Sequence, residues 1–240
     1  MRRVMKRRPV SAGGVPLDST YAKALLHFDR NFTDSTGLQT WTDTNATITT
    51  SQKVFGAGSI QSSGTGHQLS APKEMVDFGT SYYAWDMWIR FTTINSLNMI
   101  FDQFGSTTNL MSFYYNGAYF RLSHTVGNVT MAVANWTDSI STDTWYHLAL
   151  VRDGSGMRLF RDGGLLTPWS VVSAVGKDIG VLPDAFTLMS RVGDYAIAGQ
   201  MDELSLSIGT DRISVSTDAL YCGGTPANGF TPPAGPYALA

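Results

Sequence analysis

The alternation of apolar and polar residues predicts β-strands along most of the chain. The clearest case is the segment 83–91, whose odd-numbered positions share one face and are apolar: Tyr83, Trp85, Met87, Ile89 and Phe91. The opposite face carries Ala84, Asp86, Trp88 and Arg90. A period of two over nine residues is typical of a half-buried strand.

Similar apolar runs recur at regular spacing, separated by turn residues. We expect strands at 54–64, 97–104, 110–115, 118–122, 129–134, 145–152, 157–161, 186–193 and 199–208. The pair Asn116-Gly117 predicts a two-residue type I′ hairpin turn. Because no credible amphipathic helix interrupts this series, the pattern predicts an all-β, two-sheet antiparallel sandwich.

The chain divides into three expected parts. Residues 1–17 form a basic arm and linker, 18–228 form one domain, and 229–240 form a Pro-rich extended tail, since Pro232, Pro233 and Pro236 disfavour helix and central-strand pairing. Cys222 is the only cysteine, so no intrachain disulfide is expected. No apolar run approaches the roughly 18–20 residues that span a bilayer, so no membrane partner is expected.

The charge is concentrated at the N-terminus. The chain has 17 Lys and Arg against 19 Asp and Glu, and five of the positive residues lie within the first eight. The remainder of the chain is therefore acidic, with 12 positive and 19 negative residues. We interpret the arm as a docking element for protein, comprising Arg2, Arg3, Val4, Met5, Lys6, Arg7 and Arg8. Nucleic acid is a less favoured partner because the acidic body would repel phosphate. A solubility tail is the third interpretation.

Four segments, in order, resemble the concanavalin A-like, laminin-G-like jelly-roll domains. They are VFGAGSIQSSG, YAWDMWIRF, WYHLALVRDGSGMRLFRDGGLL and GQMDELSLS. The closing FTPPAGPY is similar to the end of such domains in bacteriophage virion proteins. The resemblance covers about residues 18–237 and implies a jelly-roll sandwich. The arm has no counterpart in the family pattern, and YCGGTPANG replaces the Arg-Tyr-Thr-like run that usually precedes the tail.

Glycan-cleaving relatives carry their carboxylates on one strand as Glu-x-Asp-x-x-Glu. The only glutamates here, Glu74 and Glu203, lie far apart and outside that pattern, so we expect no enzyme activity and no catalytic residues. Asp202 is expected to be structural, pointing inward with Leu204 and Leu206 and accepting backbone hydrogen bonds. Trp88 lies outside the expected core, so a loop, the arm or a neighbouring subunit should cover it.

No cofactor is expected. The four histidines, His27, His67, His124 and His147, lack zinc-ligand spacing. Laminin-G-like domains often bind Ca²⁺ through aspartates in rim loops, which leaves Asp102, Asp138, Asp143 and Asp194 as candidates among which the sequence does not choose.

Exposed aromatic residues can stack against sugar rings. Trp41, Trp136, Trp169 and Tyr195 stand in polar or turn contexts, which makes them candidate glycan-stacking residues. The alternative is that they cap loops of the sandwich.

Together these features predict a non-enzymatic bacteriophage virion structural protein, located on the capsid or the tail. It would dock through its arm on other virion proteins or on copies of itself, in an oligomeric assembly formed in the host cytoplasm. The alternative is a carbohydrate-binding host-recognition adhesin that binds surface glycans. A glycan depolymerase is less favoured than either.

Overall fold

A computed structural model describes residues 15–153, 156–172, 176–191, 194–209 and 232–239. The seven arm residues Arg2, Arg3, Val4, Met5, Lys6, Arg7 and Arg8 lie outside these ranges, as does Cys222. Within the described ranges no helix is both long and apolar enough to span a membrane.

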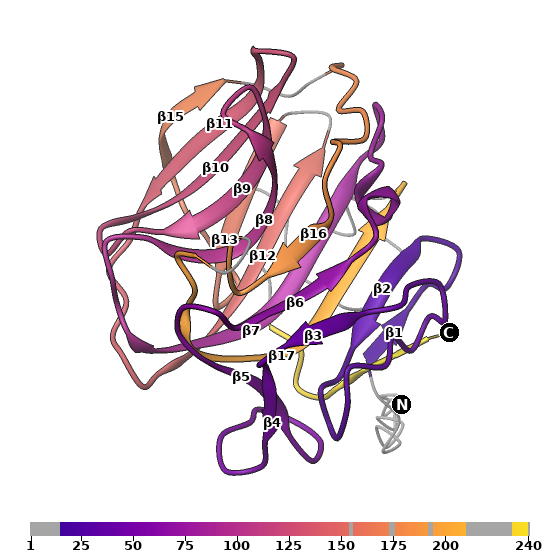
Figure 1. Cartoon of the computed structure of the whole chain (residues 1–240), viewed down its shortest axis with the longest axis vertical. Helices are drawn as coiled ribbons and strands as arrows, with labels where there is room; N and C mark the ends of the chain where they lie inside the picture. The colour runs from indigo at the N-terminus through magenta and orange to yellow at the C-terminus, as the bar shows by residue number, and fades with distance from the viewer. Residues whose placement is uncertain (1–14, 154–155, 173–175, 192–193, 210–231, 240) are drawn as a thin grey trace, which may run out of the picture.

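Two eight-stranded antiparallel sheets pack face to face (Figure 1). The first, here called the β10 sheet, has the order β15 (Pro168–Val172), β11 (Val129–Thr137), β10 (Tyr119–Val126), β9 (Asn109–Tyr115), β8 (Asn98–Ser106), β16 (Phe186–Leu188), β6 (Gln68–Ala71) and β3 (Thr42–Thr44). The second, the β7 sheet, has the order β14 (Gly164–Leu165), β13 (Gly156–Arg161), β12 (Trp145–Asp153), β7 (Tyr83–Thr93), β17 (Ala198–Ile208), β5 (Ser59–Ser63) and β4 (Thr47–Thr49), with β2 (Ala22–Leu26) also paired to β17. A single 3₁₀ turn, η1 (Lys73–Val76), is the one helical element of the described residues. The predicted all-β sandwich is confirmed.

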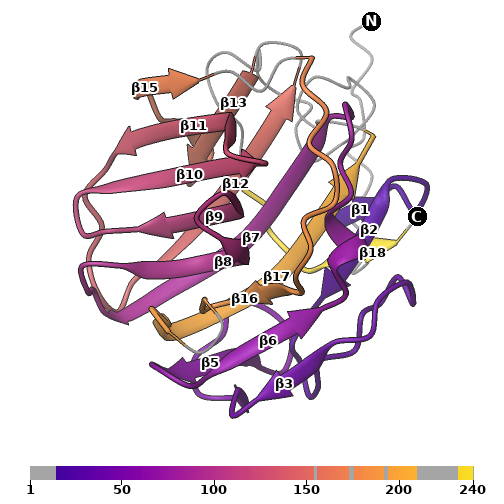
Figure 2. The ribbon, with the colours of Figure 1, turned by 45° about the horizontal axis from the view of Figure 1, so that its top comes forward.

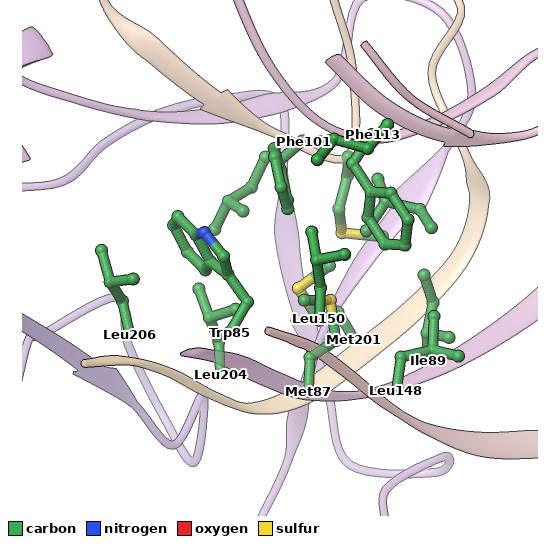
Figure 3. Packing of buried hydrophobic residues seen from close by; sticks show 14 of the residues in the cluster. Trp85, Met87, Ile89, Phe101, Phe113, Leu148, Leu150, Met201, Leu204 and Leu206 are labelled. Carbon is green, nitrogen blue, oxygen red and sulfur yellow. The ribbon is translucent and has the colours of Figure 1, made fainter. Parts of the chain in front are cut away.

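The main core lies between the two sheets and is rich in aromatic rings (Figure 3). Trp85 from β7 stacks on Phe101 from β8 and Phe186 from β16, with ring centroids 4.9 and 5.1 Å apart. The five odd-numbered residues of 83–91 are all buried here, as their period predicts. Each such side chain contributes about 1.5–3 kcal/mol by leaving water.

The opposite face of β7 is also largely buried. The prediction that this strand is only half-buried, with one exposed face, is therefore wrong. Ala84 and Asp86 have no exposed surface. A second hydrophobic cluster covers part of this face: Leu17, Ala22, Leu25, Ala84, Ala149, Val151, Phe160 and Tyr237. The chain ends supply part of the cover, because β1 (Val15–Leu17) and β18 (Tyr237–Leu239) pair in parallel beside it.

The β1–β18 pair joins the segment expected as a linker to the segment expected as a tail. Val15 stands opposite Tyr237, and Leu17 opposite Leu239. The three-part division of the chain stays a prediction. The pairing nevertheless shows that the described ends of the chain lie together, on the outer side of the β7 sheet.

The hairpin at Asn116 is present, but its turn is not the predicted type I′. That turn needs positive φ at both central residues, whereas here only Gly117 has one, φ +91°. The connection is longer by one residue. The Asn116 side-chain oxygen accepts hydrogen bonds from the amides of Ala118 (3.0 Å) and Tyr119 (2.9 Å), which stabilises the wider turn.

Two predicted strands are shorter than expected. The strand over 186–193 ends at Leu188, because Met189 adopts a left-handed backbone conformation with φ +62°. The strand over 54–64 begins only at Ser59, after a Gly-rich bend.

Candidate functional site

Aromatic and charged side chains gather on the outer side of the β10 sheet. Phe113, Phe120 and Leu122 point into the core, so Tyr114, Tyr119 and Arg121 face outward by alternation. We call this surface the open face, and it comprises Asp102, Phe104, Ser112, Tyr114, Tyr119, Arg121, Trp169, Arg191 and Tyr195. Figure 2 shows its strands β15, β11, β10, β9 and β8 side by side in front of β12 and β13.

Arg191 is held at the centre of one ion-pair network. Its Nε donates to Asp102 Oδ2 (3.0 Å) and its Nη2 donates to Ser112 Oγ (2.8 Å). Ser112 also donates to Asp102 Oδ1. Burial raises the pKa of Asp102, while the bonds from Arg191 and Ser112 oppose that rise. The carboxylate therefore serves to orient the guanidinium, which remains partly exposed.

Aromatic rings flank the same guanidinium. Its carbon lies 4.4 Å from the Phe104 ring centroid and 5.8 Å from that of Tyr195. Tyr195 is 50% exposed and sits in a left-handed backbone conformation with φ +53°. Cation–π contacts of this kind contribute about 0.5–1 kcal/mol at exposed sites.

A second aromatic group lies near the edge of the sheet. Trp169 from β15 is 61% exposed, and Tyr119 contacts it edge-on with 5.9 Å between ring centroids. Tyr114 on β9 stands opposite Arg121 on β10. Its strand lies between β10, which carries Tyr119, and β8, which carries Asp102, the partner of Arg191. Burial is the largest cause of the raised pKa of Tyr114. The open face thus runs from Trp169 to Tyr195.

The prediction of Trp136 as a stacking residue is wrong. Its side chain has no exposed surface and belongs to the main core. Ala132, Ala134 and Trp136 alternate along β11 and all point between the sheets, so no ligand can reach the indole.

Trp41 lies away from the open face. It precedes β3, at the opposite edge of the β10 sheet from β15, and contacts Phe186 edge-on at 6.4 Å. A separate groove of about 450 Å³ adjoins it, lined by Phe32, Thr33, Asp34, Gly37, Gln39, Thr40 and Trp41. The structure therefore brings Trp169 and Tyr195 to one surface and leaves Trp41 at another.

Asp202 is buried and accepts backbone hydrogen bonds as expected, but it does not share a face with Leu204 and Leu206. The register between β17 and β7 shifts between Asp202 and Ser205, with Glu203 at φ +50°. Asp202 therefore faces outward, where Oδ2 accepts from the amides of Val54 (2.8 Å) and Phe55 (3.1 Å). Burial raises the pKa of Asp202 to about 7, although the hydrogen bonds from the Phe55 and Val54 amides act to lower it.

Glu203, at the same bulge, joins the end of β2 and the start of β18 to the β7 sheet. Its carboxylate lies 3.0 Å from His27 Nδ1 and accepts a hydrogen bond from the Tyr237 amide at 3.0 Å. The hydrogen bond with Glu203 is the main cause of the raised pKa of His27. Nearby, Trp88 is covered by Phe55 from the loop before β5, at 6.0 Å, and by His147 at 5.2 Å.

The four aspartates considered for Ca²⁺ have separate surroundings. Asp102 is in a strand and pairs with Arg191, Asp138 pairs with Arg161, and Asp143 pairs with Arg90. Asp194 closes a tight backbone turn with Arg191. In the part of the chain that the structure describes, no three His, Cys, Asp or Glu residues group as metal ligands.

Tyr114, Tyr119, Arg121, Phe104 and Arg191 are open-face residues that the sequence interpretation missed. For three of them a signal was available, because Tyr114, Tyr119 and Arg121 alternate with core residues in adjacent predicted strands. Arg191 offers no such signal, since its position over Asp102 depends on how β16 and β8 meet.

Comparison with known proteins agrees with this architecture. Residues 63–210, more than half of the chain, match a family model described as Concanavalin A-like lectin/glucanases superfamily. The chain belongs to this superfamily. The sequence matches none of the curated proteins compared with it.

Solved structures share the fold at low sequence identity. Domain 4 of AbnA, a GH43 extracellular arabinanase from Geobacillus stearothermophilus solved with arabinotriose, is 16% identical, with a TM-score of 0.61 over 79% of this chain and 93% of that one. The botulinum neurotoxin serotype D binding domain is 9% identical, with a TM-score of 0.58 over 81% of this chain and 49% of that one. A botulinum neurotoxin type C structure, described as interacting with two ganglioside molecules, is 14% identical with a TM-score of 0.53, over 79% of this chain and 48% of that one. The chain thus spans about half the length of the toxin domains.

Proposed function

We propose that this chain is a non-catalytic glycan-binding protein and that its open face holds the carbohydrate. One observation carries the proposal: Trp169 is 61% exposed and yet braced by Tyr119. An exposed indole in a fixed orientation offers a flat apolar surface to a sugar ring at little cost in conformational entropy.

The rest of the open face supplies polar groups for sugar hydroxyls. Arg191 presents donors beside the Tyr195 and Phe104 rings, in an orientation set by Asp102. Binding sites commonly combine apolar rings with a few fixed polar groups in this way. The solved relatives that carry an arabinotriose, or are described with gangliosides, support the same class of ligand.

The surroundings of the two glutamates support a non-catalytic role. Glu74 is exposed in η1, whereas Glu203 is buried and bonded to His27 and Tyr237. Glycosidases need two carboxyl groups flanking one bond, about 5–10 Å apart depending on mechanism. Both bonds of Glu203 hold β2 and β18 in place.

The test is binding of the full chain to an array of neutral and acidic oligosaccharides. We expect at least one glycan to bind, and Trp169→Ala to weaken that binding about three- to tenfold, in line with the worth of an aromatic contact. Tyr82→Ala removes an exposed tyrosine elsewhere and should bind normally. Absence of binding to every glycan, or equal binding by Trp169→Ala, would refute the proposal.

We further propose that the chain works in a bacteriophage virion and docks through its N-terminal arm. The arm and the FTPPAGPY ending support this on sequence grounds. The position of the chain ends also supports it, because Val15 and Tyr237 pair on the outer side of the β7 sheet. An arm that leaves from this side would direct the open face away from the surface on which it docks.

Particle incorporation tests the docking role. Replacing Arg2, Arg3, Lys6, Arg7 and Arg8 with Ser should lower the copy number on particles while the purified protein stays folded. Arg30→Ser, at an exposed position of the body, is the control. Wild-type copy number in the five-site variant would contradict the docking role without affecting the glycan proposal.

A further inference from the structure

The open face carries two guanidinium groups in different states. Arg191 is fixed by Asp102 and Ser112 through Nε and Nη2, and its Nη1 makes no hydrogen bond to the described residues. Because Asp102 balances its charge, this pair presents an oriented donor with little net charge. Such a fixed planar group suits recognition of a carboxylate or another flat anion.

Arg121 adds an unbalanced positive charge. It lies on β10 between Tyr114 of β9 and Asn135 of β11. Its side chain is half-buried, and no ion pair or hydrogen bond joins it to another residue of the described ranges. Neighbouring strands are about 4.8 Å apart. Asp102, the partner of Arg191, is on β8, two strands from β10, so Arg121 and the Arg191 site are separated by roughly 10 Å.

The open face is therefore locally positive around Arg121, within an acidic protein. The outward positions on β8 to β11 and β15 carry one acidic residue, Asp102, and it already faces Arg191. The exposed Asp194 lies beyond Arg191, at the Tyr195 end of the face. Residues 9–240 have 12 positive and 19 negative charges, so the body as a whole repels anions. A ligand with negative charges gains more here than a neutral one because Arg121 makes no ion pair with any residue that the structure describes.

We propose that the open face selects glycans with acidic sugar residues, with Arg121 and the free edge of Arg191 binding successive anionic groups and Tyr114 lying between them. This inference rests on the proposed glycan-binding function and narrows its ligand class. The aromatic rings contact sugar rings of any charge. The two arginines supply the preference for acidic ones.

A pair of matched ligands tests the preference: oligogalacturonate and its methyl ester, which keeps the sugar ring and removes the charge. We expect the charged oligomer to bind at least about tenfold more tightly, with an affinity that falls as salt is added. A sulfated oligosaccharide of similar length distinguishes sulfate from carboxylate as the anion. Tighter binding of either acidic ligand than of the methyl ester supports the inference.

Arg121→Gln is the informative variant, because no hydrogen bond or ion pair within the described part of the chain depends on the Arg121 side chain. It should weaken binding of the acidic oligomer about three- to tenfold and leave binding of the methyl ester unchanged. The affinity of Arg121→Lys for the acidic oligomer should lie between those of wild type and Arg121→Gln. The affinity of Arg30→Gln should match wild type. Arg191 is unsuitable for this purpose, since its loss would leave Asp102 buried and unpaired.

The outcomes separate the inference from the proposed function. If some glycans bind but the ester matches the acid, or Arg121→Gln binds the acid normally, the acidic preference is wrong and glycan binding stands. If no glycan of any charge binds, both proposals fail.

Discussion

The two outer surfaces of the sandwich carry similar residue types and differ in what covers them. On the β7 sheet, Asp86, His147 and Glu203 are buried, and the chain ends cross this side as β1 and β18. On the β10 sheet, Trp169 and Tyr195 are at least half exposed, and Arg121 has no described partner. The difference shows that residue type alone does not decide whether a side chain on the outside of a sheet is exposed.

The buried charges of both surfaces meet the same physical requirement. A buried charge must be paired and hydrogen-bonded, or it costs several kcal/mol. Glu203 meets this through His27 and Tyr237. On the open face Asp102 meets the same requirement through Arg191 and Ser112. Trp169 and Tyr195 are exposed instead, and they carry no such desolvation cost.

The largest effect is expected from removing the cover of the β7 sheet. Tyr237→Ala empties a buried position in the second hydrophobic cluster and should destabilise the fold by about 3 kcal/mol. Urea unfolding measures this, with the exposed Tyr82→Ala as control. A loss as small as that of the control would mean that β18 does not contribute to the stability of the domain.

Glu203→Ala should destabilise the fold slightly less than Tyr237→Ala does. It removes the partners of His27 and of the Tyr237 amide, a loss of about 2–3 kcal/mol for bonds to a charged group. Glu74→Ala, at an exposed glutamate, should change stability by less than about 0.5 kcal/mol. Glycan binding should survive in both variants, and its loss in Glu203→Ala, with the fold intact, would place Glu203 in the binding site after all.

The raised pKa of Asp202 predicts that the stability of the fold depends on pH. Its pKa is raised to about 7 in the folded state, so between its ordinary pKa and pH 7 the folded protein holds a proton that the unfolded chain releases. The stability from this group is complete below its ordinary pKa and is lost as the pH rises through 7. His27, whose pKa is also raised, acts in the same direction.

Thermal melts of wild type and Asp202→Asn between pH 5 and pH 8 measure this effect. Because asparagine does not titrate, wild type should lose several degrees relative to the variant as the pH rises. If the melting temperature of wild type minus that of Asp202→Asn stays constant or increases as the pH rises, the raised pKa of Asp202 is contradicted.

The smallest expected effect is on the stability of open-face variants. Trp169→Ala and Arg121→Gln should each change the free energy of unfolding by less than about 0.5 kcal/mol, as measured in urea. A larger loss would show that these residues support the sheet, as their counterparts on the β7 sheet do.

The sequence predicts the sandwich well because its strands are long and regularly patterned. The five apolar residues of 83–91 lie in the core as predicted. For Trp136 the polar neighbours Asn135 and Thr137 suggest an exposed position, whereas the period-two series Ala132, Ala134, Trp136 indicates the core correctly. Local alternation was the better guide, because it reflects which side of the sheet a residue faces.

The rest depends on contacts between distant segments. Burial of Asp86 requires cover that its own strand does not encode, and the β1–β18 pair joins residues more than 200 positions apart. The bulge at Glu203 reverses the side on which Asp202 points, which strict alternation cannot anticipate. The open face likewise depends on Arg191 meeting Asp102, 89 positions away.

The most direct test of the account is to locate the ligand by amide NMR. The isotope-labelled chain is titrated with the oligosaccharide that binds best on the array. Shifts confined to the amides of β8, β9, β10, β11 and β15 and of Arg191 and Tyr195 are the predicted result. Shifts on the outer side of the β7 sheet, or only around the Trp41 groove, would contradict the account.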